Sequence, residues 1–449
     1  MSRRDIEKLW ESRESESLTN AEAAHLYRRA AFGATSGEIK AATNEALGAV
    51  VDRMLDDAVS SEGAQLEKNF QQMKSVVIAG NIYTQLPAWW LYRLIHTSRP
   101  ALEQMVLFWH GHFATSAAKV QSPTLLLRQN EAFRRHALGS FTDLVMDVSR
   151  DPAMLLYLDS ATNRRNRPNE NYARELLELF CLGVGHYTEK DIKELARAFT
   201  GWELRGETFQ FNRFQHDPGE KKLLGKTGIE SGEQAIEVII QSPQTARFIA
   251  RKLVRYFVSD GDDIGDDLIE PLAQSFRENG FQLRAGLRKL FTSRLFYSEL
   301  SIGRKIRSPV DMAVGLLRTL QATTNTISLA ESTRELGQSL FFPPNVKGWD
   351  GGRQWINSAT LIGRINLVTK LLGPETTFKA GSSEKIDSAF GVQNATEAVG
   401  LAESLLLARV LNGKQKSEVV QKISSEKPER SNLLAAIKVL ATMAEFQLA

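Results

Sequence analysis

Residues 84–116, TQLPAWWLYRLIHTSRPALEQMVLFWHGHFATS, form the richest apolar stretch of this 449-residue chain. Apolar residues recur at helical spacing over 84–97 and again over 100–116, so the stretch predicts two buried helices. Its most apolar part, residues 102–113, contains Glu103 and two histidines and is shorter than the roughly 20 residues that cross a bilayer. The pattern therefore indicates the interior of a globular helical protein and no membrane span.

A period near 3.6 residues continues on both sides of this stretch, and strict alternation of apolar and polar residues is scarce. The one good strand candidate is 208–211, TFQF, which a turn at 205–207 connects into a small hairpin near 204–214. The chain is therefore predicted to be mainly α, a multi-helix, bundle-like globular domain with one small β-hairpin and a helical C-terminal appendage.

The chain divides into four expected segments: an N-terminal helical extension at 1–19, a main helical domain at 20–372, a linker at 373–394 and a C-terminal helical appendage at 395–449. The linker is polar and aperiodic. Residues 341–352, FFPPNVKGWDGG, predict a loop because two prolines cannot lie inside a helix. We expect this loop to pack inward through Trp349, since its large apolar residues would otherwise form an unusually large exposed patch.

The composition is that of an ordinary globular protein, with 42% hydrophobic and 24% charged residues. Lys and Arg number 56 against 53 Asp and Glu, a net charge of +3, so no global field attracts nucleic acid and none is expected as a partner. The single cysteine, Cys181, excludes an intramolecular disulfide framework and multi-cysteine metal sites. No apolar signal segment is visible near residue 1, so we expect a cytoplasmic protein, with export alongside a partner left open.

The polar residues most suited to chemistry lie in 169–202, NENYARELLELFCLGVGHYTEKDIKELARAFTGW. At about 100° per residue, a helix here places Asn171, Arg174, Glu175 and Glu178 on one face. Two carboxylates one turn apart can ligate a metal or divide acid and base roles. The alternative is a solvated face with an ion pair between Arg174 and Glu178 at i,i+4.

Two histidine-containing motifs are candidate metal ligands. His110 and His112 lie in FWHGHF, and on a helix their side chains diverge by about 200°. Joint ligation therefore requires the helix to end at Gly111, and the alternative is two histidines in an aromatic core. His216 and Asp217 can form a second ligand pair, or an ordinary turn before a Pro-Gly sequence. A divalent metal is the cofactor that these residues suggest.

Basic and aromatic residues suggest contacts to a substrate. Arg247, Arg251 and Arg255 recur every four residues beside Lys252, a stripe that can hold phosphate, sulfate or carboxylate groups or can be a solvated helix face. Trp202, Trp349 and Arg353 lie near glycines and polar residues. Such tryptophans can stack on sugar rings or can pin a long loop onto the core.

Six segments together resemble one bacterial family, called domain of unknown function 1800, over about residues 20–370. They are 25–33 (HLYRRAAFG), 108–115 (FWHGHFAT), 169–180 (NENYARELLELF), 187–192 (YTEKDI), 198–202 (AFTGW) and 343–349 (PPNVKGW). The resemblance identifies no reaction. Members are often encoded beside another uncharacterised family that resembles sulfatases and carries export signals, which implies such a protein as a partner. The resemblance also favours the polar residues of 108–112 and 169–202 as site candidates.

Two functional hypotheses follow. The first is a metal-assisted hydrolase that acts on an anionic or polymer substrate. Its expected catalytic residues are Glu175, Glu178 and Arg174; its metal ligands are His110, His112, His216 and Asp217; its substrate-binding residues are Asn171, Trp202, Trp349 and Arg353. The second is a non-catalytic protein that binds or matures an exported sulfatase-like partner, with the same polar residues forming a buried structural network.

Overall fold

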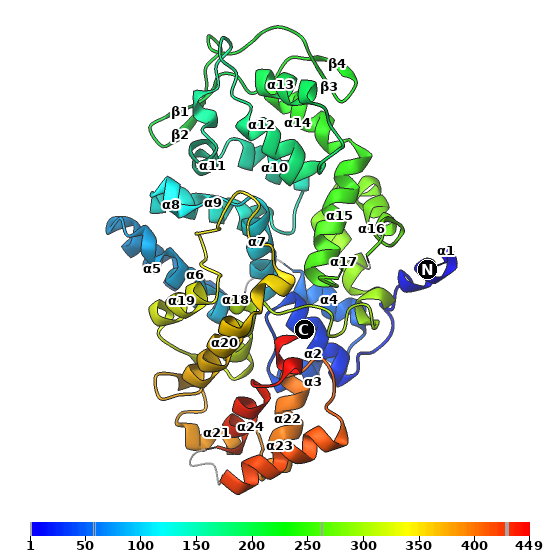
Figure 1. The fold of residues 1–449 in the computed structure, drawn as a ribbon, viewed down its shortest axis with the longest axis vertical. Helices are drawn as coiled ribbons and strands as arrows, with labels where there is room; N and C mark the ends of the chain where they lie inside the picture. Colours follow the sequence, from blue (N-terminus) through cyan, green and yellow to red (C-terminus); the bar gives the residue numbers. More distant parts are fainter. Residues whose placement is uncertain (1, 57, 59, 262–263, 427–430) are drawn as a thin grey trace.

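The computed structural model describes residues 2–56, 58, 60–261, 264–426 and 431–449. The described chain is mainly α-helical and elongated (Figure 1). In this view α6, α7 and α18 lie in the middle of the molecule, the strands β1 to β4 lie at the upper end, and α21 to α24 lie at the lower end. The expected fold class, mainly α with a small hairpin and helices at the C-terminus, is confirmed.

The element bounds are as follows. The first helices are α1 (Arg3–Leu9), α2 (Asn20–Ala30), α3 (Ser36–Ala42), α4 (Leu47–Met54), α5 (Ser61–Ala79), α6 (Leu86–His96), α7 (Pro100–His112), α8 (Ala117–Val120) and α9 (Pro123–His136). They are followed by α10 (Phe141–Ser149), α11 (Pro152–Tyr157), α12 (Asn171–Glu175), α13 (Glu189–Ala198), α14 (Gly232–Ile240), α15 (Pro243–Phe257), α16 (Asp266–Glu278) and α17 (Leu283–Phe291). The last are α18 (Pro309–Thr319), α19 (Thr326–Glu335), α20 (Ser358–Leu371), α21 (Ile386–Ala389), α22 (Ala395–Leu406), α23 (Gly413–Glu426) and α24 (Asn432–Leu440).

The strands form three two-stranded antiparallel sheets in the described part of the chain. The predicted hairpin is present, with β1 (Trp202–Arg205) paired to β2 (Thr208–Phe211). A second hairpin, β3 (Lys221–Leu223) with β4 (Lys226–Ile229), was not expected. Its two-residue turn has positive φ at both Leu224 and Gly225, and leucine is no signal for such a turn. The third sheet joins β5 (Ala322–Thr323) to β6 (Thr377–Phe378), a long-range pairing without a local signature.

Residues 373–394, expected as a linker, contain β6 and α21 and bury Phe378 and Ile386. The C-terminal helices contact the start of the chain, where the Arg28 guanidinium donates to the carbonyl oxygen of Leu407 at 2.8 Å. The division into segments is untested by these contacts and stays a prediction. Among the described residues, no helix is both long enough and apolar enough to cross a bilayer.

The two helices predicted at 84–116 are α6 and α7, and both are buried. From Ala101 to His110 every residue of α7 is buried, as in a helix that other elements surround on all sides. Proline at the first or second position starts each helix without losing an internal hydrogen bond. This packing encloses one ionised side chain, Glu103, whose exposed fraction is 0%.

Glu103 is the centre of a buried ionic network. Its carboxylate accepts hydrogen bonds from Trp90 (3.0 Å) and Arg93 (2.6 Å) on α6 and from Arg134 (2.6 Å) on α9. Arg93 continues the network to Glu67 on α5 at 2.8 Å. Burial raises the pKa of Glu103, but Arg134 and Arg93 together lower it by more, so the carboxyl stays ionised. Four helices are thereby tied to one charge.

Glu103→Gln should lower the free energy of unfolding by about 3–5 kcal/mol, because it leaves Arg134 without a counter-charge and Arg93 with only its pair to Glu67. Chemical denaturation of both proteins measures the difference. Glu331→Gln is the matched control, since its ion pair with Arg334 is exposed on both sides and its loss should leave the unfolding midpoint close to that of the wild type. Similar midpoints for the two variants would show that Glu103 does not organise the core.

A second buried carboxyl, Asp151, caps α11. It accepts from the backbone N–H of Met154 at 2.9 Å and from the side chain of Gln129 at 2.6 Å. No basic side chain forms an ion pair with it in the described chain. Burial therefore dominates and raises the pKa of Asp151 to about 7, although these two hydrogen bonds oppose the shift.

The folded protein thus holds a proton on Asp151 that the unfolded chain loses near pH 4, so stability falls as pH rises from about 4 to 7. Asparagine also caps helices and does not titrate, so the free energy of unfolding of Asp151→Asn relative to the wild type should rise by about 2–4 kcal/mol between pH 5 and pH 8. Urea unfolding at both pH values measures this. Asp143→Asn, an exposed residue in the first turn of α10, should show no such pH-dependent difference.

Candidate functional site

A large cleft lies beside the C-terminal end of α7. Its volume is about 1040 Å³, the size of a site for an extended ligand. One side is formed by the end of α7, another by α15, and the rest by the loops 303–308 and 347–355. Because α7 is fixed by the Glu103 network, this side of the cleft has a rigid foundation.

The cleft is strongly basic. Its seven basic side chains are Arg251, Lys252, Arg255, Arg304, Lys305, Lys347 and Arg353, and its three acidic ones are Asp260, Asp311 and Asp350. Some of the positive charge is compensated: Arg251 pairs with Asp266 on α16, and Lys305 lies 3.1 Å from Asp260. The excess remains, and a concave surface with one sign of charge concentrates ions of the opposite sign.

Three of these cations are available to a ligand. Lys347 and Arg353 are exposed, and neither side chain forms an ion pair with another described residue. Lys252 likewise forms no ion pair in the described chain; its ammonium lies 5.3 Å from the centre of the Phe248 ring. Burial, followed by repulsion from Arg255, lowers the pKa of Lys252, so an anion beside this ammonium would be favoured.

The basic side chains predicted as one stripe on 247–255 all lie on α15, but only some of them line the cleft. Apolar residues such as Ile249 and Leu253 bury the opposite face of the helix. Arg251 and Arg255 line the cleft, whereas Arg247 is outside the cleft lining and pairs with Glu270 at 2.7 Å. The stripe is therefore neither fully solvated nor fully part of the site.

His112 also lines the cleft, with only 5% of its surface exposed. Its Nε2 lies 3.0 Å from the carbonyl oxygen of Phe180, so Nε2 carries the proton and donates. Nδ1 then bears a lone pair, and this buried atom has no hydrogen-bond partner among the described residues. Burial, followed by repulsion from Lys252, lowers the pKa of His112 well below its ordinary value, so the ring is neutral.

His110 lies one layer deeper. Its Nε2 accepts from the backbone N–H of Phe341 at 2.9 Å, and burial lowers its pKa to about 3. Because α7 continues through Gly111 to His112, the two rings project in different directions. The structure therefore does not bring His110 and His112 together as joint ligands.

The loop 341–352 packs on the end of α7. The Trp349 ring lies 5.6 Å from the His110 ring and lines the cleft, partly buried. At Gly348 φ is +80°, and a Cβ there would collide with the carbonyl oxygen of Gly111. Glycine at 348 is what lets the loop approach α7 closely enough to bring Trp349 and Lys347 to the cleft.

The helix that begins at Asn171 changes geometry after Glu175. Residues 176–181 form a π-helix, so the step of about 100° per residue used to predict one polar face fails there. Arg174 pairs with Glu189 (2.9 Å) and Glu170 (3.3 Å) instead of Glu178. Glu178 accepts from the hydroxyl of Tyr187 at 2.8 Å.

Of this predicted face, Glu175 is the residue with an electrostatic interaction with a cleft cation, Lys347. Its half-buried carboxylate forms no hydrogen bond or ion pair with another described side chain. Burial, then repulsion from Glu178, raises the pKa of Glu175, while Arg174 and Lys347 lower it. Lys347 lines the cleft, so Glu175 is within electrostatic range of the cleft edge. Asn171 is exposed and outside the cleft lining.

The remaining predicted residues are structural components near the hairpins. Trp202 is buried against Phe199 and Phe209, so it is not available to a sugar. Both ring nitrogens of His216 lie 2.8 Å from carbonyl oxygens, and Asp217 pairs with Arg197 at 2.8 Å. Over the described chain, no group of three or more His, Cys, Asp or Glu side chains is arranged to hold a metal ion.

Some of the residues singled out in the sequence line the cleft, and their functional roles stay predictions. His112, Trp349 and Arg353 line the cleft, as do Arg251, Lys252 and Arg255 of the basic stripe. Arg304 and Lys305 were missed; their only local signal is the short basic run GRKIR at 303–307. Lys347 was also missed, although it lies within the motif PPNVKGW at 343–349.

Fold and cleft together define a mainly α-helical protein with a basic site at the end of a buried helix. Residues 25–448 match the family described as "Protein of unknown function (DUF1800)", so the chain belongs to this family. The match extends beyond the resemblance at 20–370 and includes the C-terminal helices. A comparison with curated proteins and one with solved structures gave no match.

Glu175→Gln should keep or raise the free energy of unfolding at pH 7.5, by up to about 1 kcal/mol, because it removes an unpaired half-buried charge next to Glu178. A raised carboxyl pKa destabilises the fold as pH rises, so the gain should vanish near pH 4. Thermal melts with and without a divalent metal measure both effects. Glu189→Gln, which breaks a surface pair with Arg174, should instead lower the melting temperature slightly. A clear loss of stability in Glu175→Gln would mean that Glu175 holds the fold together.

Proposed function

We propose that this protein binds a segment of an anionic saccharide polymer in the basic cleft and hydrolyses it. The observation that carries the proposal is the gathering of seven basic side chains around one cleft of about 1040 Å³. A single small anion needs far less space, so the cleft suits a ligand with several sulfate, phosphate or carboxylate groups. Exposed Lys347 and Arg353 supply the contacts at the edge.

Trp349 supports a saccharide as the backbone of this ligand. Its ring lines the cleft, as Arg353 does, and packs against the ring of His110. A partly exposed indole with a rigid support offers an apolar face for a sugar ring, while neighbouring cations bind the anionic substituents. An aromatic face and charges in one cleft match a charged sugar better than a simple inorganic ion.

His112 is the group that we propose for the chemistry. A neutral imidazole whose Nε2 donates to a fixed carbonyl oxygen has its Nδ1 free to accept a proton. In hydrolysis it would take a proton from a water whose oxygen bonds to the substrate, while the bond to the leaving oxygen breaks and that oxygen takes a proton from solvent. The sequence favoured a metal-assisted form of this reaction; the proposal relies on His112 because the expected ligands His110, His216 and Asp217 are engaged elsewhere.

Lys252→Met should weaken binding of dextran sulfate or polygalacturonate about tenfold, corresponding to about 1.4 kcal/mol for one lost charge contact in a partly buried site. Isothermal titration calorimetry at two salt concentrations measures the affinity, which should fall with added salt. Arg247→Met is the matched control, because it removes a cation from the same helix outside the cleft. Equal affinities for the two variants, or equal binding of neutral dextran, would contradict the proposal, as would a clear preference for a single-stranded oligonucleotide.

His112→Gln separates hydrolysis from binding. It should keep the affinity within a few-fold and abolish the release of reducing ends, sulfate or phosphate from the bound polymer. The second hypothesis, a non-catalytic partner of an exported sulfatase-like protein, expects the wild type to bind the polymer without any release. Binding without turnover by the wild type would therefore support the cleft as a polymer-binding site and contradict the proposed hydrolysis.

A further inference from the structure

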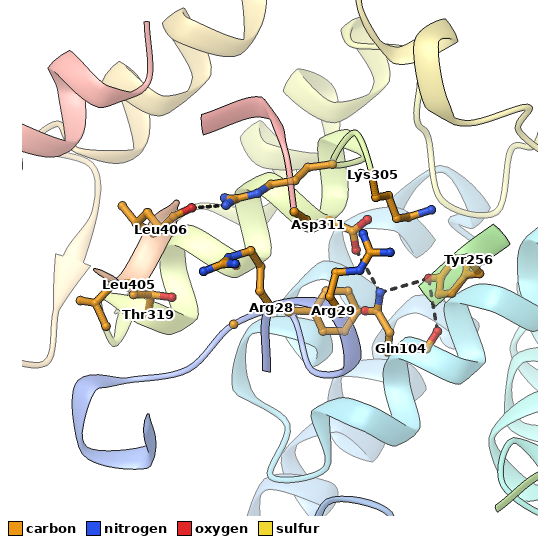
Figure 2. Close-up of a pocket in the computed structure, with 14 residues that line it drawn as sticks. Arg28, Arg29, Gln104, Tyr256, Lys305, Asp311, Thr319, Leu405 and Leu406 are labelled. Atoms are coloured by element: carbon orange, nitrogen blue, oxygen red, sulfur yellow. Dashed lines mark hydrogen bonds between the residues drawn. The ribbon is translucent and has the colours of Figure 1, made fainter. Parts of the chain in front are cut away.

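A second, much smaller pocket shares part of its lining with the cleft, and Figure 2 shows the residues around it. Tyr256, Lys305 and Asp311 line both spaces. The pocket measures about 20 Å³. A water needs about 10–15 Å³ by the same measure, so the pocket has room for one or two particles of that size. A tetrahedral phosphate or sulfate with its four oxygens is too large.

The walls of this small pocket are cationic. Arg28 and Arg29 come from the last turns of α2, and Lys305 and Arg307 come from the loop before α18. Asp311 is the only acidic side chain in the lining. Lys305 pairs with Asp260, which lies outside the lining, at 3.1 Å. Arginine is almost never buried without a paired charge, so the three arginines around Asp311 still leave an excess of positive charge.

Two of these arginines have buried N–H groups without partners in the described chain. Arg29, 3% exposed, donates Nε to the carbonyl oxygen of Phe257 at 3.0 Å, while Nη1 and Nη2 donate to nothing. Arg28 uses Nη2 for Leu407 and leaves Nε and Nη1 without a partner. An unmade hydrogen bond from a buried charged donor is costly, so these groups require an acceptor. In Figure 2 the Arg29 guanidinium lies beside Gln104 and Asp311, whereas that of Arg28 lies on the side of Leu405.

Asp311 cannot meet this demand. Among the described residues its carboxylate forms no ion pair with any of the three arginines, and it accepts instead from Gln104 at 3.2 Å and from the Ser308 hydroxyl at 2.8 Å. Burial lowers the pKa of Arg29 to about 10, and burial with repulsion from Arg29 lowers the pKa of Arg28 to about 10, so both stay charged at neutral pH. A neutral water can accept hydrogen bonds but leaves this charge uncompensated.

We propose that the small pocket is a binding site for one monatomic anion, chloride under physiological conditions. The excess of buried cations, the unpartnered guanidinium donors and the small volume agree on this class of ligand. A water is the competing occupant, because Gln104 also lines the pocket with an unpartnered Oε1 that a water could bridge to an arginine. The site differs from the cleft in ligand and size and does not depend on the function proposed for the cleft.

Crystals of the full chain soaked in sodium bromide distinguish the two occupants, since bromide replaces chloride and gives an anomalous signal. We expect a peak in this pocket. In solution, raising chloride from 1 to 100 mM at constant ionic strength, with gluconate as the balancing anion, should raise the melting temperature by about 3 °C through ligand linkage. Density for water without anomalous signal, or identical melting in chloride and gluconate, would overturn the proposal.

Arg29→Met tests the donor. The variant removes a buried charge, so it should fold without chloride and lose the chloride-dependent rise in melting temperature. Arg318→Met is the matched control, a partly buried arginine outside the pocket that donates to the carbonyl oxygens of Leu94, Ile95 and Thr97. It should keep the rise. A wild-type chloride response in Arg29→Met would overturn the proposal, and the bromide experiment decides the question if that variant does not fold.

Discussion

Glu103 must remain charged in a place from which water is excluded, and the positions of the central helices follow from that requirement. Its carboxylate is satisfied only when Trp90 and Arg93 of α6 and Arg134 of α9 approach α7 together. Directional hydrogen bonds of this kind tolerate little sliding between helices, whereas apolar packing alone tolerates more. Because α7 is fixed relative to α6 and α9, the end of α7 is fixed as well, and with it His112 beside the cleft.

The positive charge of the cleft results from how the chain folds and not from its overall composition. The chain as a whole carries only +3, yet three segments that are distant in sequence bring seven basic side chains to one cleft. Many of the remaining arginines are neutralised by surface partners, as Arg288 is by Asp52 and Glu14. A near-neutral net charge therefore excludes a global electrostatic field, but it gives no information about a local field such as that of the cleft.

Local sequence patterns were sufficient for most of the helices and for the first hairpin. Periodicity identified α6 and α7, and alternation identified the strand at Thr208–Phe211, because both signals lie within a few residues. The β5–β6 pair and the partners of Arg174 were beyond such reasoning, since they depend on tertiary contacts. For the site, aromatic and histidine motifs pointed to His112 and Trp349, whereas Lys305 acquires its role only through the loop geometry.

The π-helix at Leu176–Cys181 has a consequence for how this family can vary in length. A π-helix accommodates one residue more than an α-helix of the same extent, so deleting a residue here would restore regular helical hydrogen bonding. The same deletion would rotate Phe180 away from His112, whose Nε2–H would lose its acceptor. A regular helix and the present orientation of the His112 imidazole therefore exclude one another in this short segment.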